Sequence, residues 1–260
     1  MTHVMTTPPT IMLDVREVRK QFGGFVAVNS VSLSLAAGER RALIGPNGAG
    51  KTTLFNLLSG RLAPDEGDVL YKGTSILKVS PSEICKRGMA RTFQITNVFV
   101  KLSVIQNVQT ALYAHRRRSH WLLRNAAAVL RDEAYALLDM VGIRALAERQ
   151  AGLLSYGDQK RLELAMVMAL EPQLLLLDEP TAGVELNTRR ELVALIKDLC
   201  TRKQLSLLFC EHDMDAVFSI ADQITVLHQG QILAEGTPGE ISSNPKVREI
   251  YLGSEHGRVA

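Results

Sequence analysis

A glycine-rich segment holds the residues best suited to phosphate chemistry. It follows the short strand expected at 41–44 and fits the pattern G-x-x-x-x-G-K-[ST]. Its residues are Gly45, Pro46, Asn47, Gly48, Ala49, Gly50, Lys51, Thr52 and Thr53. The glycines allow backbone N–H groups to turn toward phosphate oxygens, and a helix that begins near Lys51 adds its positive end. Lys51 can reach the β- and γ-phosphates, and the Thr52 hydroxyl can coordinate Mg²⁺. The segment predicts binding of a nucleoside triphosphate.

Two adjacent carboxylates end a second apolar run. Residues 174–177 are all leucine, and Asp178 and Glu179 follow them. A carboxylate at the end of a buried strand can hold Mg²⁺ beside a phosphate loop, which is the role predicted for Asp178. Glu179 can orient or deprotonate an attacking water. Taken alone, the run is equally typical of a strand that leaves the core in a charged turn closed by Pro180. The phosphate loop favours the chemical interpretation.

The elements that must position these residues alternate along the chain. Short antiparallel strands are expected over 11–37 around Gly23 and Gly24, with further strands at 41–44, 69–71, 174–177, 205–210 and 223–235. Helical patterns cover 51–60, most of 103–150, 158–170, 188–201 and a short tail after Pro238. Such alternation, with a helical block midway, predicts an α/β sheet that carries an all-α insertion.

Composition excludes several classes of protein. The chain has 260 residues, 46% of them hydrophobic, and a formal net charge of +3. A disordered or collagen-like chain would be less apolar, and a nucleic-acid binder relying on bulk charge would be more basic, so no nucleic-acid partner is expected. Its three cysteines form no C-x-x-C pair, so neither a disulfide framework nor a zinc site is predicted. Without a signal-peptide pattern or an apolar run of about 20 residues, we expect a cytosolic chain, at most peripheral to a membrane.

A third segment, Leu-Ser-Tyr-Gly-Asp-Gln at 154–159, connects the first two motifs to a known family. Ser155 is placed to cap a helix, and Gly157 allows close backbone approach at a helix start that can bind an anion. Alone, this is an ordinary helix cap. Beside the phosphate loop and the acidic strand end, it resembles the Leu-Ser-Gly-Gly-Gln signature of ATP-binding cassette (ABC) ATPases. Tyr156 and Asp158 depart from that signature, whereas Ser155 and Gly157 match it.

Further residues stand where this family has functional ones. Phe22 resembles the aromatic residue that stacks on adenine. Gln94 matches the glutamine that senses Mg²⁺ and the γ-phosphate, and His212 matches the switch histidine at the γ-phosphate. Glu185 stands where the family usually has Asp or Asn in the loop between protomers. The resemblance therefore implies catalytic roles for Glu179, His212, Gln94 and Lys51, and Mg²⁺ contacts for Thr52, Gln94 and Asp178.

The resemblance spans about 11–253 and implies a P-loop NTPase (RecA-like) core sheet, an antiparallel β subdomain and a helical subdomain at about 95–165. Residues 1–10 and 254–260 are expected to be flexible termini. In this family two protomers enclose two ATP molecules, each between the phosphate loop of one and the signature of the other. Ser155, Gly157 and Asp158 would then bind the partner's ATP. The second protomer can be an identical copy or a paralogue.

A closer likeness points to the ATPase subunits of branched-chain amino acid importers. The segments that carry it are 156–163, 211–214, 234–238 and 244–253. This likeness implies two transmembrane permease subunits, a periplasmic or extracellular solute-binding protein, and a peripheral position on the cytoplasmic face of a bacterial inner membrane. An exporter ATPase of the lipopolysaccharide-export type remains the alternative, and a soluble non-transport ABC ATPase is a further one. Nothing in the sequence specifies the transported solute.

A basic cluster at 116–118, with Trp121 nearby, is the one local concentration of positive charge. A solvated helix–loop face accounts for such a cluster. Contact with anionic lipid headgroups or with a permease loop is the other interpretation, because charge beside an amphipathic tryptophan suits an interface.

Overall fold

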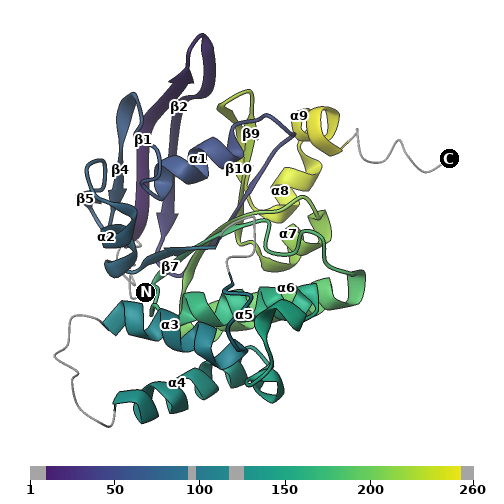
Figure 1. Cartoon of the computed structure of the whole chain (residues 1–260). Helices are drawn as coiled ribbons and strands as arrows, with labels where there is room; N and C mark the ends of the chain where they lie inside the picture. Colours follow the sequence, from purple (N-terminus) through teal and green to yellow (C-terminus); the bar gives the residue numbers. More distant parts are fainter. Residues whose placement is uncertain (1–9, 93–97, 117–125, 253–260) are drawn as a thin grey trace, which may run out of the picture.

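Two β-sheets and a layer of helices make up the computed structural model, which describes residues 10–92, 98–116 and 126–252 (Figure 1). The central sheet has the order β10-β9-β3-β8-β7-β6 and is parallel except for β10. Its strands are β3 (Arg40–Ile44), β6 (Met89–Arg91), β7 (Leu174–Asp178), β8 (Ser206–Cys210), β9 (Gln223–His228) and β10 (Gln231–Gly236). The second sheet is antiparallel, with the order β2-β1-β4-β5. Its strands are β1 (Ile11–Phe22), β2 (Phe25–Ala36), β4 (Glu66–Tyr71) and β5 (Thr74–Ser75).

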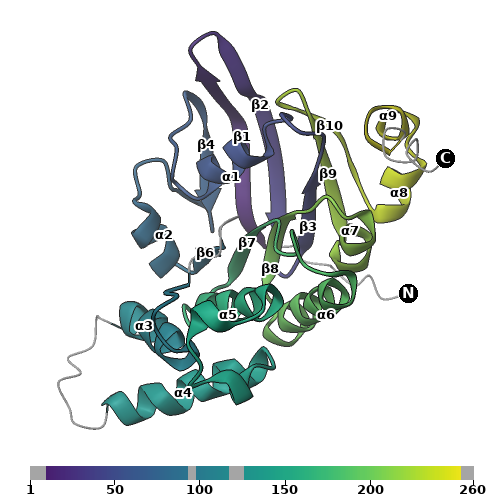
Figure 2. The same ribbon diagram turned by 45° about the vertical axis from the view of Figure 1, so that its right-hand side comes forward.

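The helices are divided between the two faces of the central sheet. Those of the described residues are α1 (Lys51–Leu58), α2 (Pro81–Lys86), α3 (Val104–Arg116), α4 (Ala126–Met140), α5 (Tyr156–Met168), α6 (Leu186–Lys203), α7 (Met214–Ile220), α8 (Pro238–Ser243) and α9 (Pro245–Val247). Short 3₁₀ turns cover Arg144–Leu146 and Ala151–Leu153, and a π turn covers Arg248–Leu252. In Figure 2, α1 lies between the two sheets, whereas α3 to α6 lie below the central sheet.

Strand β7 shows how one sheet divides the interior. Its Leu174 and Leu176 pack with α1 and the antiparallel sheet, while Leu175 and Leu177 pack with α3 to α7. Successive side chains of a strand point to opposite faces, so a strand covered on both faces needs an unbroken apolar run. All five residues of β7 are buried. The predicted α/β sheet with a helical insertion is confirmed.

The region 11–37 differs from its prediction. Instead of several short strands it forms two twelve-residue strands joined at Gly23 and Gly24. Their pairing register shifts between Val15 and Val18, where Glu17 adopts a φ of 47°. This bulge changes the face to which side chains point, and it therefore breaks the apolar alternation that one continuous strand would show.

Four elements of the structure had no counterpart in the sequence prediction: the two-residue strand β5, α2, β6 and α7. Helix α2 carries a readable signal, because Ser80 accepts a hydrogen bond from the Glu83 N–H and Pro81 begins the helix. Asp213 caps α7 in the same way through the Ala216 N–H. Strand β6 has three residues, too few for a periodic pattern.

Some predictions fall on residues outside the described part of the chain. Gln94 is one of them, and so are Arg117, Arg118 and Trp121 of the basic cluster. The termini expected to be flexible also lie outside it, apart from Thr10. The boundaries 11–253 for one domain and 95–165 for its helical subdomain stay predictions.

Candidate functional site

The glycine-rich loop connects β3 to α1 and requires glycine at two close approaches. A Cβ atom on Gly45 would lie 2.1 Å from the Leu227 carbonyl oxygen, and one on Gly50 would lie 2.3 Å from that of Ala27. Gly50 also has a φ of 101°, a left-handed conformation that side chains disfavour, and it is the N-cap of α1. The chain therefore turns tightly from strand to helix here, so that the first N–H groups of α1 have no partner within the helix.

Lys51 reaches back over this loop. Its ammonium Nζ donates to the carbonyl oxygens of Gly45 at 2.6 Å and of Pro46 at 3.0 Å. Burial lowers the pKa of Lys51, while the negative charges of Glu179 and Asp178 act against that shift. The lysine charge thus lies at the loop, among the residues predicted to bind phosphate, and Thr52 beside it is exposed.

Parallel strands bring the acidic residues to the same edge of the sheet. Leu43 of β3 pairs with Cys210 of β8, and Cys210 pairs with Asp178 of β7. The segments that leave these three strands therefore begin side by side. They are the phosphate loop after β3, the segment with His212 after β8 and the segment with Glu179 after β7. Ligands of open α/β sheets bind at this carboxyl edge.

Glu179 and His212 form a direct pair at that edge. Glu179 Oε1 lies 3.1 Å from His212 Nε2, and the two side chains are 20% and 41% exposed. Glu179 has a φ of 50°, a strained conformation for a residue with a side chain, held by its N–H donating to the Cys210 carbonyl at 3.1 Å. A carboxylate held by an imidazole, partly open to solvent, can accept a proton from water.

Glu211 organises the turns around this pair, a role that the sequence did not predict. Its Oε1 accepts hydrogen bonds from the Thr181 N–H at 2.8 Å and hydroxyl at 2.7 Å, and its Oε2 accepts from the His212 N–H at 3.2 Å. Burial raises the pKa of Glu211, against the effect of these hydrogen bonds. The carboxyl group thereby fixes the segment after Glu179 to the segment that carries His212.

Arg91 is a second residue that sequence reasoning missed. It ends β6, and its Nη2 lies 3.0 Å from Asp178 Oδ2, with both side chains less than a tenth exposed. Its Nη1 donates to Asn56 Oδ1 and Ser59 Oγ of the α1 region, each at 2.8 Å. Arg91 therefore connects the acidic strand end to the helix that follows the phosphate loop.

The signature segment caps α5 as predicted. Ser155 Oγ accepts from the Asp158 N–H at 3.2 Å and donates to Asp158 Oδ2 at 2.7 Å. The departure at Asp158 is thus part of the cap, where an acid suits the positive end of a helix. A Cβ on Gly157 would lie 2.4 Å from Thr188 Cγ2, so a larger residue here would force the Thr188 side chain to move.

The structure does not bring the signature and the phosphate loop together. Helices α1 and α5 belong to different cores, on opposite faces of the central sheet (Figure 2). Phe22 stands at the end of β1, paired with Phe25 across the hairpin and 47% exposed, and the Lys20 ammonium lies 5.7 Å from the centre of its ring. Its flat side chain is available for stacking.

Comparison with known proteins decides the family. Residues 28–182 match the model of the ABC transporter family. The chain belongs to this family. Residues 231–257 also match a model described as branched-chain amino acid ATP-binding cassette transporter. ABC cassettes bind nucleotide and hydrolyse ATP, so this chain is an ATPase, and the predicted P-loop NTPase fold is confirmed.

Relatives and solved structures agree with that assignment. The high-affinity branched-chain amino acid transport ATP-binding protein LivG of Salmonella typhimurium is 40% identical over 249 residues, which cover 93% of this chain and 98% of LivG. The corresponding protein BraF of Pseudomonas aeruginosa is 39% identical over the same shares. The crystal structure of the ADP conformation of MJ1267, an ATP-binding cassette of an ABC transporter, has a TM-score of 0.82 at 30% identity, covering 94% of this chain and 99% of that one.

The described part of this ABC chain has no helix long and apolar enough to cross a membrane.

Proposed function

We propose that this chain is the ATP-hydrolysing subunit of an importer of branched-chain or related amino acids. The observation that carries the catalytic part is the shared carboxyl edge, where the phosphate loop, Asp178, Glu179 and His212 begin side by side. The relatives LivG and BraF, named as branched-chain amino acid transport proteins, favour this solute and favour import over the exporter alternative.

The phosphate loop and Lys51 would hold the ATP phosphates, and Phe22 would stack on adenine. The N–H groups at the start of α1 suit phosphate oxygens, and the lysine charge beside them offsets the charge that develops in phosphoryl transfer. Thr52, Asp178 and Gln94 are the residues that would hold Mg²⁺. The hydroxyl and carboxylate fit this ion, which prefers oxygen ligands and supplies charge neutralisation at the β- and γ-phosphates.

Glu179 would act as the general base. Its carboxylate would accept the proton of the attacking water, and His212, 3.1 Å away, would keep it aimed and contact the γ-phosphate. The strained φ of 50° at Glu179 supports this role, because such strain persists only where the surroundings hold it. Glu211 would position both residues through Thr181 and the His212 N–H.

A second ATPase protomer would complete each nucleotide site. The signature at the start of α5 and the phosphate loop lie on opposite faces of the sheet, so one chain does not close around ATP with both. Ser155, Gly157 and Asp158 would contact ATP held by the partner, an identical copy or a paralogue. ATP would favour the closed pair because it contacts both protomers only there.

Separate permease subunits would form the transport path, with a solute-binding protein delivering the amino acid. Three exposed apolar residues offer a contact surface for a permease: Phe99, Val100 and Leu153 are 51%, 52% and 63% exposed. They adjoin one another, since the Gly152 N–H donates to the Val100 carbonyl at 3.0 Å. In this arrangement the chain would lie at the cytoplasmic face of a bacterial membrane, as a peripheral subunit.

Hydrolysis by the purified chain tests the catalytic part. Glu179→Gln keeps the size of the side chain but removes its proton acceptor, so we expect ATPase activity to fall by about 10²–10⁴-fold while ATP binding persists. Glu66→Gln is the control and should keep the parent rate. It alters an exposed carboxylate on β4 that pairs with Arg19 of β1. Unchanged hydrolysis in Glu179→Gln would refute the role of this carboxylate.

Uptake by cells tests the transport part. A strain that carries Lys51→Ala in this chain should lose most uptake of labelled leucine, isoleucine and valine, because the variant lacks the charge at the phosphate loop. Restoring the parent chain should restore uptake. If uptake is unchanged while an exported compound accumulates inside the cells, the importer proposal is wrong and the ATPase serves export.

A further inference from the structure

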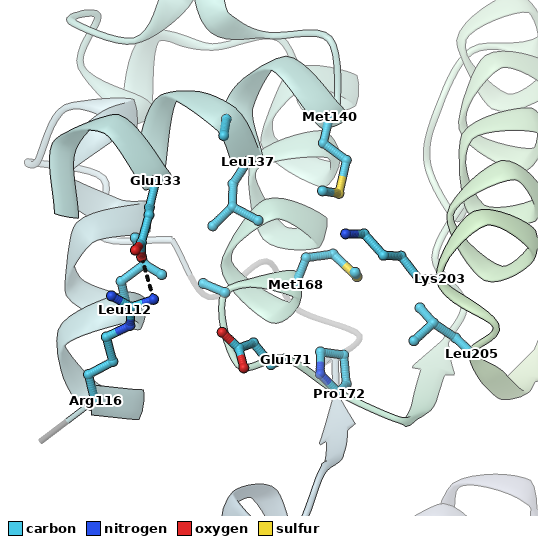
Figure 3. A pocket seen from close by; sticks show the side chains of 12 residues that line it. Leu112, Arg116, Glu133, Leu137, Met140, Met168, Glu171, Pro172, Lys203 and Leu205 are labelled. Carbon is cyan, nitrogen blue, oxygen red and sulfur yellow. Dashed lines mark ion pairs between the residues drawn. The ribbon is translucent and has the colours of Figure 1, made fainter. Parts of the chain in front are cut away.

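A cavity of about 370 Å³ lies at the amino-terminal edge of the central sheet, the edge opposite the phosphate loop (Figure 3). Pro172 and Leu205, which precede β7 and β8, form one side of it. Helices α3, α4, α5 and α6 form the rest. Its size falls in the range of about 300–1,000 Å³ typical of small-molecule sites. None of the described residues of the proposed ATP site lines this cavity.

The cavity has an apolar floor built from separate elements. Leu137 and Met140 of α4 face Met168 at the end of α5 and Leu205 before β8 (Figure 3). Leu112 of α3 adds a buried side. Methionine side chains adapt their shape to what they contact, so such a floor suits a branched aliphatic group.

Charged groups of both signs stand around that floor. Lys203, the last residue of α6, extends its ammonium toward α4 in Figure 3 and makes no ion pair or hydrogen bond within the described residues. Glu171 is 70% exposed, and its nearest basic group is His115 Nε2, at 4.0 Å. Glu171 also has a φ of 49°. Arg116 and Glu133, by contrast, pair with each other at 2.7 Å.

We propose that this cavity binds a free amino acid with a branched apolar side chain. Lys203 would hold the carboxylate, Glu171 would hold the ammonium, and the apolar floor would take the side chain. The combination of one available cation, one weakly engaged anion and an apolar floor complements such a zwitterion. The choice of leucine as probe rests on the proposed function, whereas the charges and floor do not.

The cavity contacts the helix that begins at the signature segment. Met168 ends helix α5, which Ser155 caps and whose first turn carries Gly157. A ligand here would contact both the helical layer and the loops that begin β7 and β8. It would not compete with ATP, which the chain would hold at the opposite edge of the sheet.

Calorimetric titration of the purified full chain with L-leucine tests the site. For a ligand as small as leucine we expect a Kd on the order of 1 mM. Three probes each lack one feature: 4-methylpentanoate has no ammonium, 3-methylbutylamine has no carboxylate, and L-alanine has no branched side chain. Each should bind at least about tenfold more weakly, the factor expected for losing a charge-assisted contact or several buried methylene groups.

Variants locate the binding. Lys203→Gln and Glu171→Gln should each weaken leucine binding about tenfold. Lys197→Gln, on the same helix but outside the cavity, should leave it unchanged. No heat of binding at about 10 mM leucine, equal binding of the truncated probes, or equal effects of Lys197→Gln and Lys203→Gln would overturn the proposal. Leucine binding together with intact leucine uptake in the Lys51→Ala strain would instead refute the transport proposal and leave the cavity site standing.

Discussion

The buried ion pair between Arg91 and Asp178 should be among the most strongly coupled pairs of side chains in the molecule. Their charged atoms lie 3.0 Å apart, and the side chains are 8% and 5% exposed. Water can therefore solvate neither charge when its partner is removed. Loss of one member of such a pair costs about 3–5 kcal/mol of unfolding free energy, because the remaining charge stays buried without compensation.

A double-mutant cycle isolates the pair from the other contacts of Arg91. The variants are Arg91→Met, Asp178→Asn and the combination, measured by urea unfolding without nucleotide. Arg91→Met also loses hydrogen bonds to Asn56 and Ser59, but it loses them in both backgrounds, so they cancel. We expect the double variant to be more stable than the sum of the single losses predicts, with a coupling energy of about 2–3 kcal/mol.

The exposed pair of Arg19 and Glu66 is the matched comparison. Its atoms lie 2.8 Å apart, as close as those of the buried pair, but the side chains are 33% and 64% exposed. Solvent screening should hold its coupling energy below about 1 kcal/mol. If the two cycles give the same coupling energy, burial does not strengthen the Arg91–Asp178 pair and the reasoning is wrong. The urea dependence of each variant must match that of the parent for the comparison to hold.

Three further changes have definite expected outcomes. Gly157→Ala should lower the free energy of unfolding by about 1–3 kcal/mol in urea titrations because its Cβ would meet Thr188 Cγ2, and adding Thr188→Ser, which removes that methyl, should restore most of the loss. Thr237→Ala should lower it by about 1 kcal/mol, since Thr237 caps α8 in a capping box, and helical signal against temperature measures the loss. At Asp222, burial favours the protonated acid, but hydrogen bonds from the Arg40 side chain and N–H prevail and lower the pKa below 3.8. Asp222→Asn should therefore be less stable than the parent at neutral pH. Because Asp222 is partly exposed, the loss should be less than about 1 kcal/mol of unfolding free energy. The difference should vanish as the pH falls below 3.8 and through the lowered pKa of Asp222.

Local chemistry explains which parts of the site the sequence predicts. The phosphate loop is specified by neighbouring residues, so glycine at positions 45 and 50 can be read without knowing the fold. The cap at Ser155 is local in the same sense, because donor and acceptor are three residues apart. These features therefore appear in the structure where the sequence places them.

Contacts between distant strands could not be read in the same way. Arg91 meets Asp178 because β6 pairs with β7, and a three-residue strand leaves no alternation by which to find that pairing. Glu211 looks like an ordinary acid until the fold places Thr181 against it. In both cases strand order in the sheet, which one sequence does not encode locally, decides the partner.

The four leucines of β7 have a consequence for how this sheet acquires its alignment. Residues 174–177 are identical, so sliding the strand by one position would still offer leucine to both cores over most of its length. Hydrophobicity alone therefore carries almost no information about alignment here, although elsewhere a one-residue slip moves apolar groups into water. A slipped β7 would, however, carry Asp178 away from the Arg91 guanidinium and leave two buried charges apart. The ion pair thus selects one register of β7 among several that bury similar apolar side chains. It lies at the strand end where a shift in register would displace Glu179 as well.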